Sequence, residues 1–189
     1  MDDLILPARH KITVDEYQAL GETGVLGWEA RVELIDGDII DMAPIGQDHI
    51  STVNHLNETL VLACQRRAIV SVQNPVRLDR YNEPEPDFAI FRRRADFYRT
   101  GELAGPQDTL LLIEVANTSL RYDRTIKLQL YARAGIPEYW IIDLNAQRLD
   151  TYAQPSPEGY ARTTQHGPTG HLALIQDPEI IVPLANLFG

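Results

Sequence analysis

Two acidic side chains stand on apolar segments, where a carboxylate needs a partner. Glu114 ends the apolar run 110–113, and Asp87 follows Pro86 and opens the apolar run 88–91. An ionised carboxylate in such a setting is costly unless a cation or a metal ion matches its charge. If the two segments are antiparallel neighbouring strands, the beginning of one lies beside the end of the other and the carboxylates meet. Magnesium and manganese prefer such a hard-oxygen site.

Spacing alone leaves other interpretations of these two acids open. Asp87 could cap a loop, and Glu114 could pair with an arginine. Two carboxylates could also serve a hydrolase that needs no metal, such as a glycosidase. Sensitivity to a chelator separates that class from metal-dependent hydrolysis.

Two further charged side chains could join the pair. Lys127 comes thirteen residues after Glu114, on a helix expected to pack over that strand, so its long side chain could reach back to the carboxylate. The alternative is a solvated helix lysine paired with Asp123 four residues earlier. Glu33 lies between two apolar residues of a predicted strand, and alternation favours a solvent-facing side chain for it.

Several familiar sites are excluded by their missing motifs. The chain has no Gly-x-x-x-x-Gly-Lys-Ser/Thr phosphate loop, no Gly-x-Gly-x-x-Gly turn and no Gly-x-Ser-x-Gly nucleophile elbow. Its single cysteine, Cys64, makes an internal disulfide and a cysteine-cluster zinc site impossible. Its five histidines form no His-x-His pair and no His-Glu-x-x-His motif, so His49 is most simply a polar helix residue.

Charge and hydropathy limit the partners. A net charge of −10 discourages nucleic-acid binding, but residues 64–99 carry eight arginines against five acids, which allows a local basic surface. Arg92, Arg93 and Arg94 are the candidates for phosphate contacts there, the alternative being a solvated charged face. The longest apolar run, residues 60–64, has five residues, so no membrane span is expected. The amino terminus lacks a basic region followed by an apolar stretch, which favours a cytoplasmic protein.

The elements that must position these residues can be predicted from local patterns. An apolar strand, a helix ended by Gly135 and Pro137, and a second apolar strand predict a right-handed crossover between parallel strands. At 189 residues the chain is expected to form a single domain, 1–189. The predicted helices are 13–20, 48–67 and 123–134, the predicted hairpin is 31–42, and the predicted strands are 69–72, 76–78, 87–91, 109–115, 138–142, 148–153 and 160–164.

Motifs in this order resemble a known nuclease family. Pro86-Asp87 followed by Glu114-Val115-Ala116 resembles the Pro-Asp…Asp/Glu-x-Lys signature of the PD-(D/E)XK nuclease superfamily. A longer set, spread over roughly residues 12–185, resembles the Uma-two family of restriction-type endonucleases. That set comprises Arg-Val-Glu-Leu-Ile-Asp-Gly at 31–37, Glu-Pro-Asp-Phe at 85–88, Leu-Ile-Glu-Val at 112–115, Asp123 with Lys127, and Tyr-Ala-Arg-Ala-Gly-Ile-Pro-Glu-Tyr-Trp-Ile-Ile-Asp at 131–143.

The resemblance implies a fold and a metal site. The fold is α/β and restriction-endonuclease-like, with a central mixed β-sheet flanked by helices. Asp87 and Glu114 are then ligands of Mg²⁺ or Mn²⁺, with the carbonyl of Val115 as a third ligand. Glu33 would approach the same metal region, and His49 matches a polar position near the site.

The resemblance also implies a role for the crossover helix. The superfamily lysine is absent at Ala116, and Lys127 is its expected replacement, with Asp123 as an accessory residue. The implied activity is metal-dependent hydrolysis of DNA phosphodiester bonds. The alternative is a catalytically inactive nuclease fold that serves as a binding or assembly module. Both a monomer and a homodimer remain open.

Overall fold

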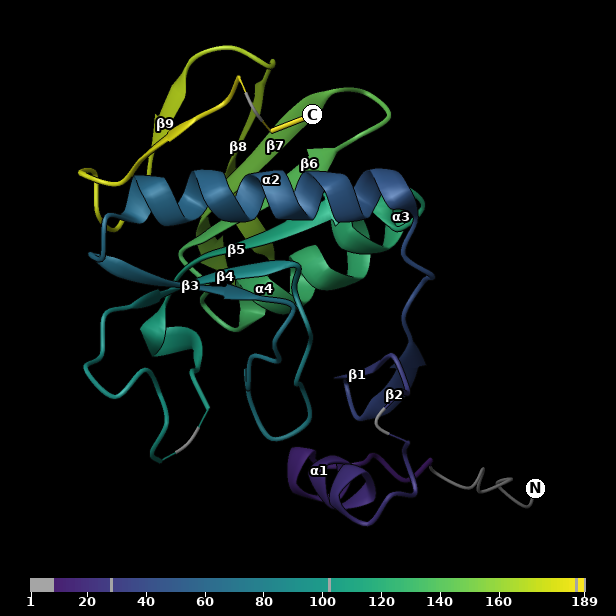
Figure 1. Ribbon diagram of the computed structural model, residues 1–189. Coiled ribbons are helices and arrows are strands. Elements are labelled where there is room, and N and C mark those ends of the chain that lie inside the picture. The colour runs from purple at the N-terminus through teal and green to yellow at the C-terminus, as the bar shows by residue number, and fades with distance from the viewer. Residues whose placement is uncertain (1–8, 28, 102, 186, 189) are drawn as a thin grey trace.

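A six-stranded mixed sheet forms the centre of the molecule (Figure 1). The computed structural model describes residues 9–27, 29–101, 103–185 and 187–188. Neighbouring strands are antiparallel except for one central parallel pair, β5 and β6. In spatial order the strands are β3 (Ala68–Val72), β4 (Phe88–Arg92), β5 (Thr109–Ala116), β6 (Glu138–Asp143), β7 (Arg148–Ser156) and β8 (Gly159–His166).

The crossover between the two parallel strands is confirmed. It begins with α3 (Leu120–Tyr122), continues through a π-helical turn (Asp123–Lys127) and ends with α4 (Leu128–Arg133). Gly135 follows with φ 75°, a left-handed conformation that ends the helix and costs glycine little. The helical segment starts three residues earlier than 123, and the sequence pattern gave no sign of its π turn.

The two faces of the sheet are covered by different helices. On one face, α2 (Gln47–Cys64) lies across the strands and packs Leu56 and Leu60 against Ile113 and Trp140 (Figure 1). On the other face, α4 packs against Leu112, Ile141 and their neighbours. Side chains along β5 therefore alternate between the two covering helices, and both faces are apolar.

The amino-terminal part forms a small separate layer below the sheet (Figure 1). Helix α1 (Val14–Glu22) begins with the predicted capping box between Thr13 and Glu16. The predicted hairpin pairs β1 (Val32–Ile35) with β2 (Asp38–Asp41), and its turn residues Asp36 and Gly37 have φ 47° and 74°. A single β-bridge, Leu34 with Glu83, ties this hairpin to the loop that precedes β4.

Three local expectations differ from the structure. Residues 76–78 are not a strand, because Val76 donates its backbone N–H to Pro84 and Leu78 donates to Asn82, which closes a loop on itself. Helix α2 ends at Cys64 rather than near residue 67, since the next residue, Gln65, is left-handed with φ 44°. A small antiparallel pair, β9 (His171–Ala173) and β10 (Ile181–Pro183), was not predicted.

In the part of the chain that the structure describes, no helix combines the length and the apolar character that a membrane crossing needs. The amino-terminal residues behind the localisation expectation lie outside that part.

Candidate functional site

A pocket opens at the end of the sheet where β4 begins and β5 ends. The first turn of α2, the hairpin β1–β2 and the segment of α3 with the π turn complete its walls. Three cationic and six acidic side chains line it, so charge is concentrated in this cavity. They are Arg31, Glu33, Asp41, His49, Glu85, Asp87, Glu114, Asp123 and Lys127.

The strand register explains why the two strand carboxylates meet. β4 and β5 are antiparallel, and Phe88 lies opposite Ile113, so the next positions in this register are Asp87 and Glu114. Opposite residues of an antiparallel pair point to the same face of the sheet. Asp87 also accepts a hydrogen bond through Oδ2 from the backbone N–H of Val115, at 2.8 Å.

Lys127 lies between two glutamates. Its Nζ is 2.9 Å from Glu114 Oε1 and 3.1 Å from Glu33 Oε2, and none of the three residues is more than 4% exposed. The structure thus pairs Lys127 with the strand glutamate and with Glu33, rather than with Asp123. Burial alone would lower the pKa of Lys127, but the charges of Glu114, Glu33 and Asp123 outweigh it and raise that pKa. The ammonium therefore stays charged.

The Glu114 carboxylate is held on one oxygen only. Oε1 accepts from Lys127 and from the hydroxyl of Tyr131, which is 2.8 Å away. Among the described residues, no hydrogen bond reaches Oε2. Burial raises the pKa of Glu114, against the opposing effect of Lys127. Lys127 and Tyr131 are four residues apart, as are Asp123 and Lys127, so this helical spacing could have pointed to Tyr131, which the sequence interpretation missed.

Asp87 is held from three directions. His49 Nε2 lies 3.0 Å from its Oδ1, Gln73 Nε2 lies 3.2 Å from the same oxygen, and the Val115 N–H binds Oδ2. The other ring nitrogen of His49, Nδ1, is 3.0 Å from the Val115 carbonyl. Both partners of the ring are acceptors, so the ring serves them best as a two-donor imidazolium. The hydrogen bond to Asp87 accordingly raises the pKa of His49.

Glu33 is buried although alternation favoured solvent. The reason is local, because the loop before β4 covers the hairpin face that carries it. Glu33 Oε2 accepts from the backbone N–H of Glu85 at 3.2 Å, in addition to its ion pair with Lys127. Glu85 itself lines the pocket, and burial raises its pKa, with Arg31 opposing and Glu33 adding to the shift.

The π turn carries the remaining charged groups. The N–H of Leu128 donates to the carbonyl of Asp123, five residues back, which widens the turn. Such turns occur often at functional sites. Asp123 is buried and accepts from Ser119 Oγ at 2.7 Å. Burial raises the pKa of Asp123 to about 6, although Lys127 acts in the opposite direction.

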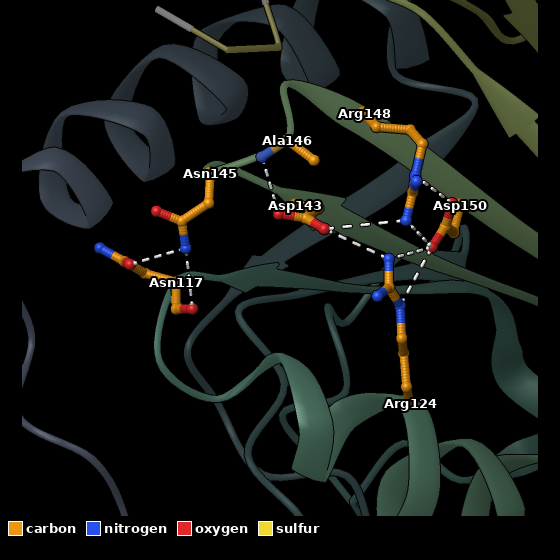
Figure 2. A network of polar contacts seen from close by, with 7 residues as sticks. All are labelled: Asn117, Arg124, Asp143, Asn145, Ala146, Arg148 and Asp150. Carbon is orange, nitrogen blue, oxygen red and sulfur yellow. Dashed lines mark hydrogen bonds and ion pairs between the residues drawn. The ribbon is translucent and has the colours of Figure 1, made fainter.

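An ion-pair network anchors the π turn to the sheet (Figure 2). Arg124 Nη2 is 2.6 Å from Asp150 Oδ2 and 3.2 Å from Asp143 Oδ2, on strands β7 and β6. Arg148 contacts Asp150 as well, at 3.0 Å. Because both aspartates are buried, this network fixes how the π turn sits over the strands.

The arginine cluster, Arg92, Arg93 and Arg94, is not brought to the pocket. It stands at the far end of β4, roughly 17 Å from Asp87 at about 3.4 Å per strand residue. Arg94 pairs with Asp96, and the Arg93 guanidinium lies over the ring of Phe97 at 4.4 Å. Phosphate contacts by this cluster stay a prediction. The arginine that does line the pocket, Arg31, was not singled out from the sequence.

Apart from Glu114 Oε2, the oxygen atoms suited to a metal are hydrogen-bonded within the protein. Within the described residues, no three His, Cys, Asp or Glu side chains are placed to hold a metal ion. His49 contacts Asp87 Oδ1 and the Val115 carbonyl, while Lys127 contacts Glu114 Oε1. The donor set itself, two carboxylates and a carbonyl at one pocket, is nevertheless the hard-oxygen chemistry that Mg²⁺ and Mn²⁺ prefer.

Comparisons with known proteins agree with the fold. The Uma2 family, described as "Putative restriction endonuclease", matches residues 14–180. Among solved structures, a putative nuclease belonging to DUF820 from Anabaena variabilis ATCC 29413 is similar with a TM-score of 0.72 and 19% identity. The match covers 94% of this chain and 97% of that one, and at this identity it shows the fold alone. The comparison with curated proteins gave no match.

Proposed function

Because this chain belongs to the Uma2 family, we propose that it is a nuclease that hydrolyses DNA phosphodiester bonds with Mg²⁺ or Mn²⁺. One observation carries the proposal: a buried lysine held between two glutamates, in a pocket that Asp87 also lines. Buried ion pairs are weak devices for stability, because removing charges from water is costly. Their concentration in one open pocket favours a chemical role over a structural one.

The residues that would hold the metal are Asp87 and Glu114, with the Val115 carbonyl. When bound there, a divalent cation polarises a phosphate oxygen and lowers the pKa of a coordinated water. The set fits such an ion in its donor chemistry, two carboxylates and a carbonyl, and Glu114 Oε2 has no hydrogen bond from the described residues.

The charge of the pocket supports metal dependence. Six acidic side chains face three cationic ones, so the pocket by itself repels an anionic phosphodiester. A divalent cation held there would offset most of that excess of negative charge.

Lys127 acts in this proposal as a fixed positive charge. Its raised pKa keeps it protonated at neutral pH, so it cannot accept a proton from water. A buried ammonium is instead suited to stabilise negative charge that develops on the phosphate. Glu33 and Tyr131 keep Lys127 and Glu114 in place, while His49 and Gln73 orient Asp87.

The direct test is an assay of the purified protein on supercoiled plasmid DNA. We expect nicked and linear DNA with Mg²⁺ or Mn²⁺ and none with EDTA. Asp87→Asn is expected to lower the rate at least about 100-fold, the usual effect of losing one charged active-site group. The control Asp177→Asn, which alters a surface ion pair with Arg67 outside the pocket, keeps the activity.

Two results would contradict the proposal. Metal-dependent DNA binding without any cleavage would favour the binding or assembly module. Cleavage that persists in EDTA would remove the metal from the reaction.

A further inference from the structure

Tyr122 carries a hydroxyl for which the protein provides no partner. It is the one buried side-chain polar atom without a hydrogen bond among the residues described. Tyr122 is the last residue of α3, next to the π turn, and it lines the pocket. A phenylalanine would fill the same space without this hydroxyl.

Three other tyrosines have their hydroxyls paired within the protein. Tyr131 donates to Glu114, Tyr139 donates to the Asp123 carbonyl at 3.3 Å, and Tyr160 donates to the Ile136 carbonyl at 3.0 Å. Proteins pair nearly all buried polar groups, and a buried hydroxyl without a partner is destabilising. The contrast leaves the Tyr122 hydroxyl available to a group that enters the pocket, and because the hydroxyl is shielded from solvent, the side chain would turn slightly to reach that group.

The surroundings indicate which kind of group this is. Burial raises the pKa of Tyr122, and the negative charge of Glu33 adds to the shift, so the phenol remains a hydrogen-bond donor. A donor is matched by an acceptor oxygen. Lys127, five residues further along the same helical segment, offers a second donor, fully charged, to the same pocket. A neutral donor and a cation together suit a singly charged oxyanion.

We propose that the Tyr122 hydroxyl donates a hydrogen bond to a non-bridging oxygen of the bound phosphodiester. This inference rests on the proposed nuclease function and adds a substrate-contacting residue to it. The competing explanation is a fixed structural water on the hydroxyl, which predicts an effect on stability and none on substrate binding.

The test compares Tyr122→Phe with the wild type and with the control Tyr160→Phe. The probe is a fluorescein-labelled 20-base-pair DNA duplex, its binding followed by anisotropy with Ca²⁺ in place of Mg²⁺. Urea unfolding of each protein is measured in parallel, and plasmid cleavage is measured with Mg²⁺. Tyr160→Phe removes a hydroxyl that the protein itself pairs, away from the pocket, so it should lower stability and leave the affinity for DNA unchanged.

For Tyr122→Phe we expect duplex binding about 10- to 100-fold weaker, the effect of one hydrogen bond to a charged acceptor, with undiminished resistance to urea. If Tyr122→Phe binds the duplex as tightly as the wild type and its stability is unchanged or lowered, the inference is overturned. In that case a wild type that binds and cleaves DNA still supports the nuclease function. A wild type that neither binds nor cleaves DNA overturns the proposed function, and this inference with it.

Discussion

Replacing Lys127 by methionine tests the buried charge triplet directly. Methionine keeps an unbranched side chain of similar length but removes the ammonium that lies 2.9 Å from Glu114 and 3.1 Å from Glu33. Both glutamates, 4% and 3% exposed, then remain buried without a cation. Their other donors, the Tyr131 hydroxyl and the Glu85 N–H, are neutral and do not replace the charge.

The expected loss of stability can be worked out from this arrangement. Breaking a buried ion pair from one side costs about 3–5 kcal/mol. A glutamate can avoid part of that loss by taking up a proton. For an ordinary pKa of about 4.3, protonation itself costs about 3.7 kcal/mol at pH 7 and only about 1 kcal/mol at pH 5. The folded-state pKa of the carboxyl is raised in this variant, so the loss is absent below about pH 4 and grows as pH rises.

The assay is urea unfolding in EDTA at pH 5 and pH 7, with the wild type measured at both. We expect Lys127→Met to lose about 4 kcal/mol at pH 7 and about 1 kcal/mol at pH 5. The control Arg133→Met breaks an exposed ion pair with Asp36 and should lose under about 1 kcal/mol at either pH. A loss at pH 7 no larger than that of the control, or one that is independent of pH, would refute the reasoning.

Four further results are expected. Because the folded pKa of Asp123 is about 6, Asp123→Asn should gain about 3 kcal/mol of stability at pH 8 and nothing near pH 3.5, measured by urea unfolding. Arg124→Gln should lose about 1–3 kcal/mol in thermal unfolding, since Asp150 keeps Arg148 as a partner; no change would show that the network does not anchor the π turn. Cys64 is buried, and its thiol pKa is raised to about 11, so a disulfide reagent at pH 8 should modify it only in urea. Substituting the arginine cluster with glutamine should weaken DNA binding and flatten its dependence on salt, whereas an unchanged slope would place the DNA surface elsewhere.

The sheet and its crossover were predictable because their signals are local. The order along the chain is an eight-residue buried strand, a helix that ends at Gly135, and a second buried strand. This order predicts a right-handed crossover between two parallel strands. The antiparallel pairing of β4 and β5 was stated as a condition for the meeting of Asp87 and Glu114, and the structure fulfils it. The approach of the two carboxylates is thus a consequence of strand order.

The partner of Lys127 could not be decided in the same way. Asp123 and Glu114 are both within reach of a lysine at that position, and only the packing angle of the helix over the sheet selects between them. Alternation predicted a solvent-facing Glu33 because it assumes that the outer side of a hairpin meets water, whereas residues 33–35 are all buried. Only the family resemblance placed Glu33 near the site, where it lines the pocket with Arg31. Tyr122 stands directly before the π turn, and no periodicity in the sequence predicts that turn.

The wide turn at residues 123–127 also determines how a change in length would act on this segment. Removing one residue there, such as the exposed Thr125, would let the helix close with ordinary α-helical hydrogen bonds. Lys127 would stay where the packing of α4 holds it, and the residues before the deletion would keep nearly the same orientation, because a π turn holds about one residue more than an α turn over the same rotation. Charge, composition and core would be nearly unchanged. Homologues that differ by a single residue in this stretch should therefore be aligned with the gap inside the turn, because the turn absorbs it without moving the side chains that face the pocket.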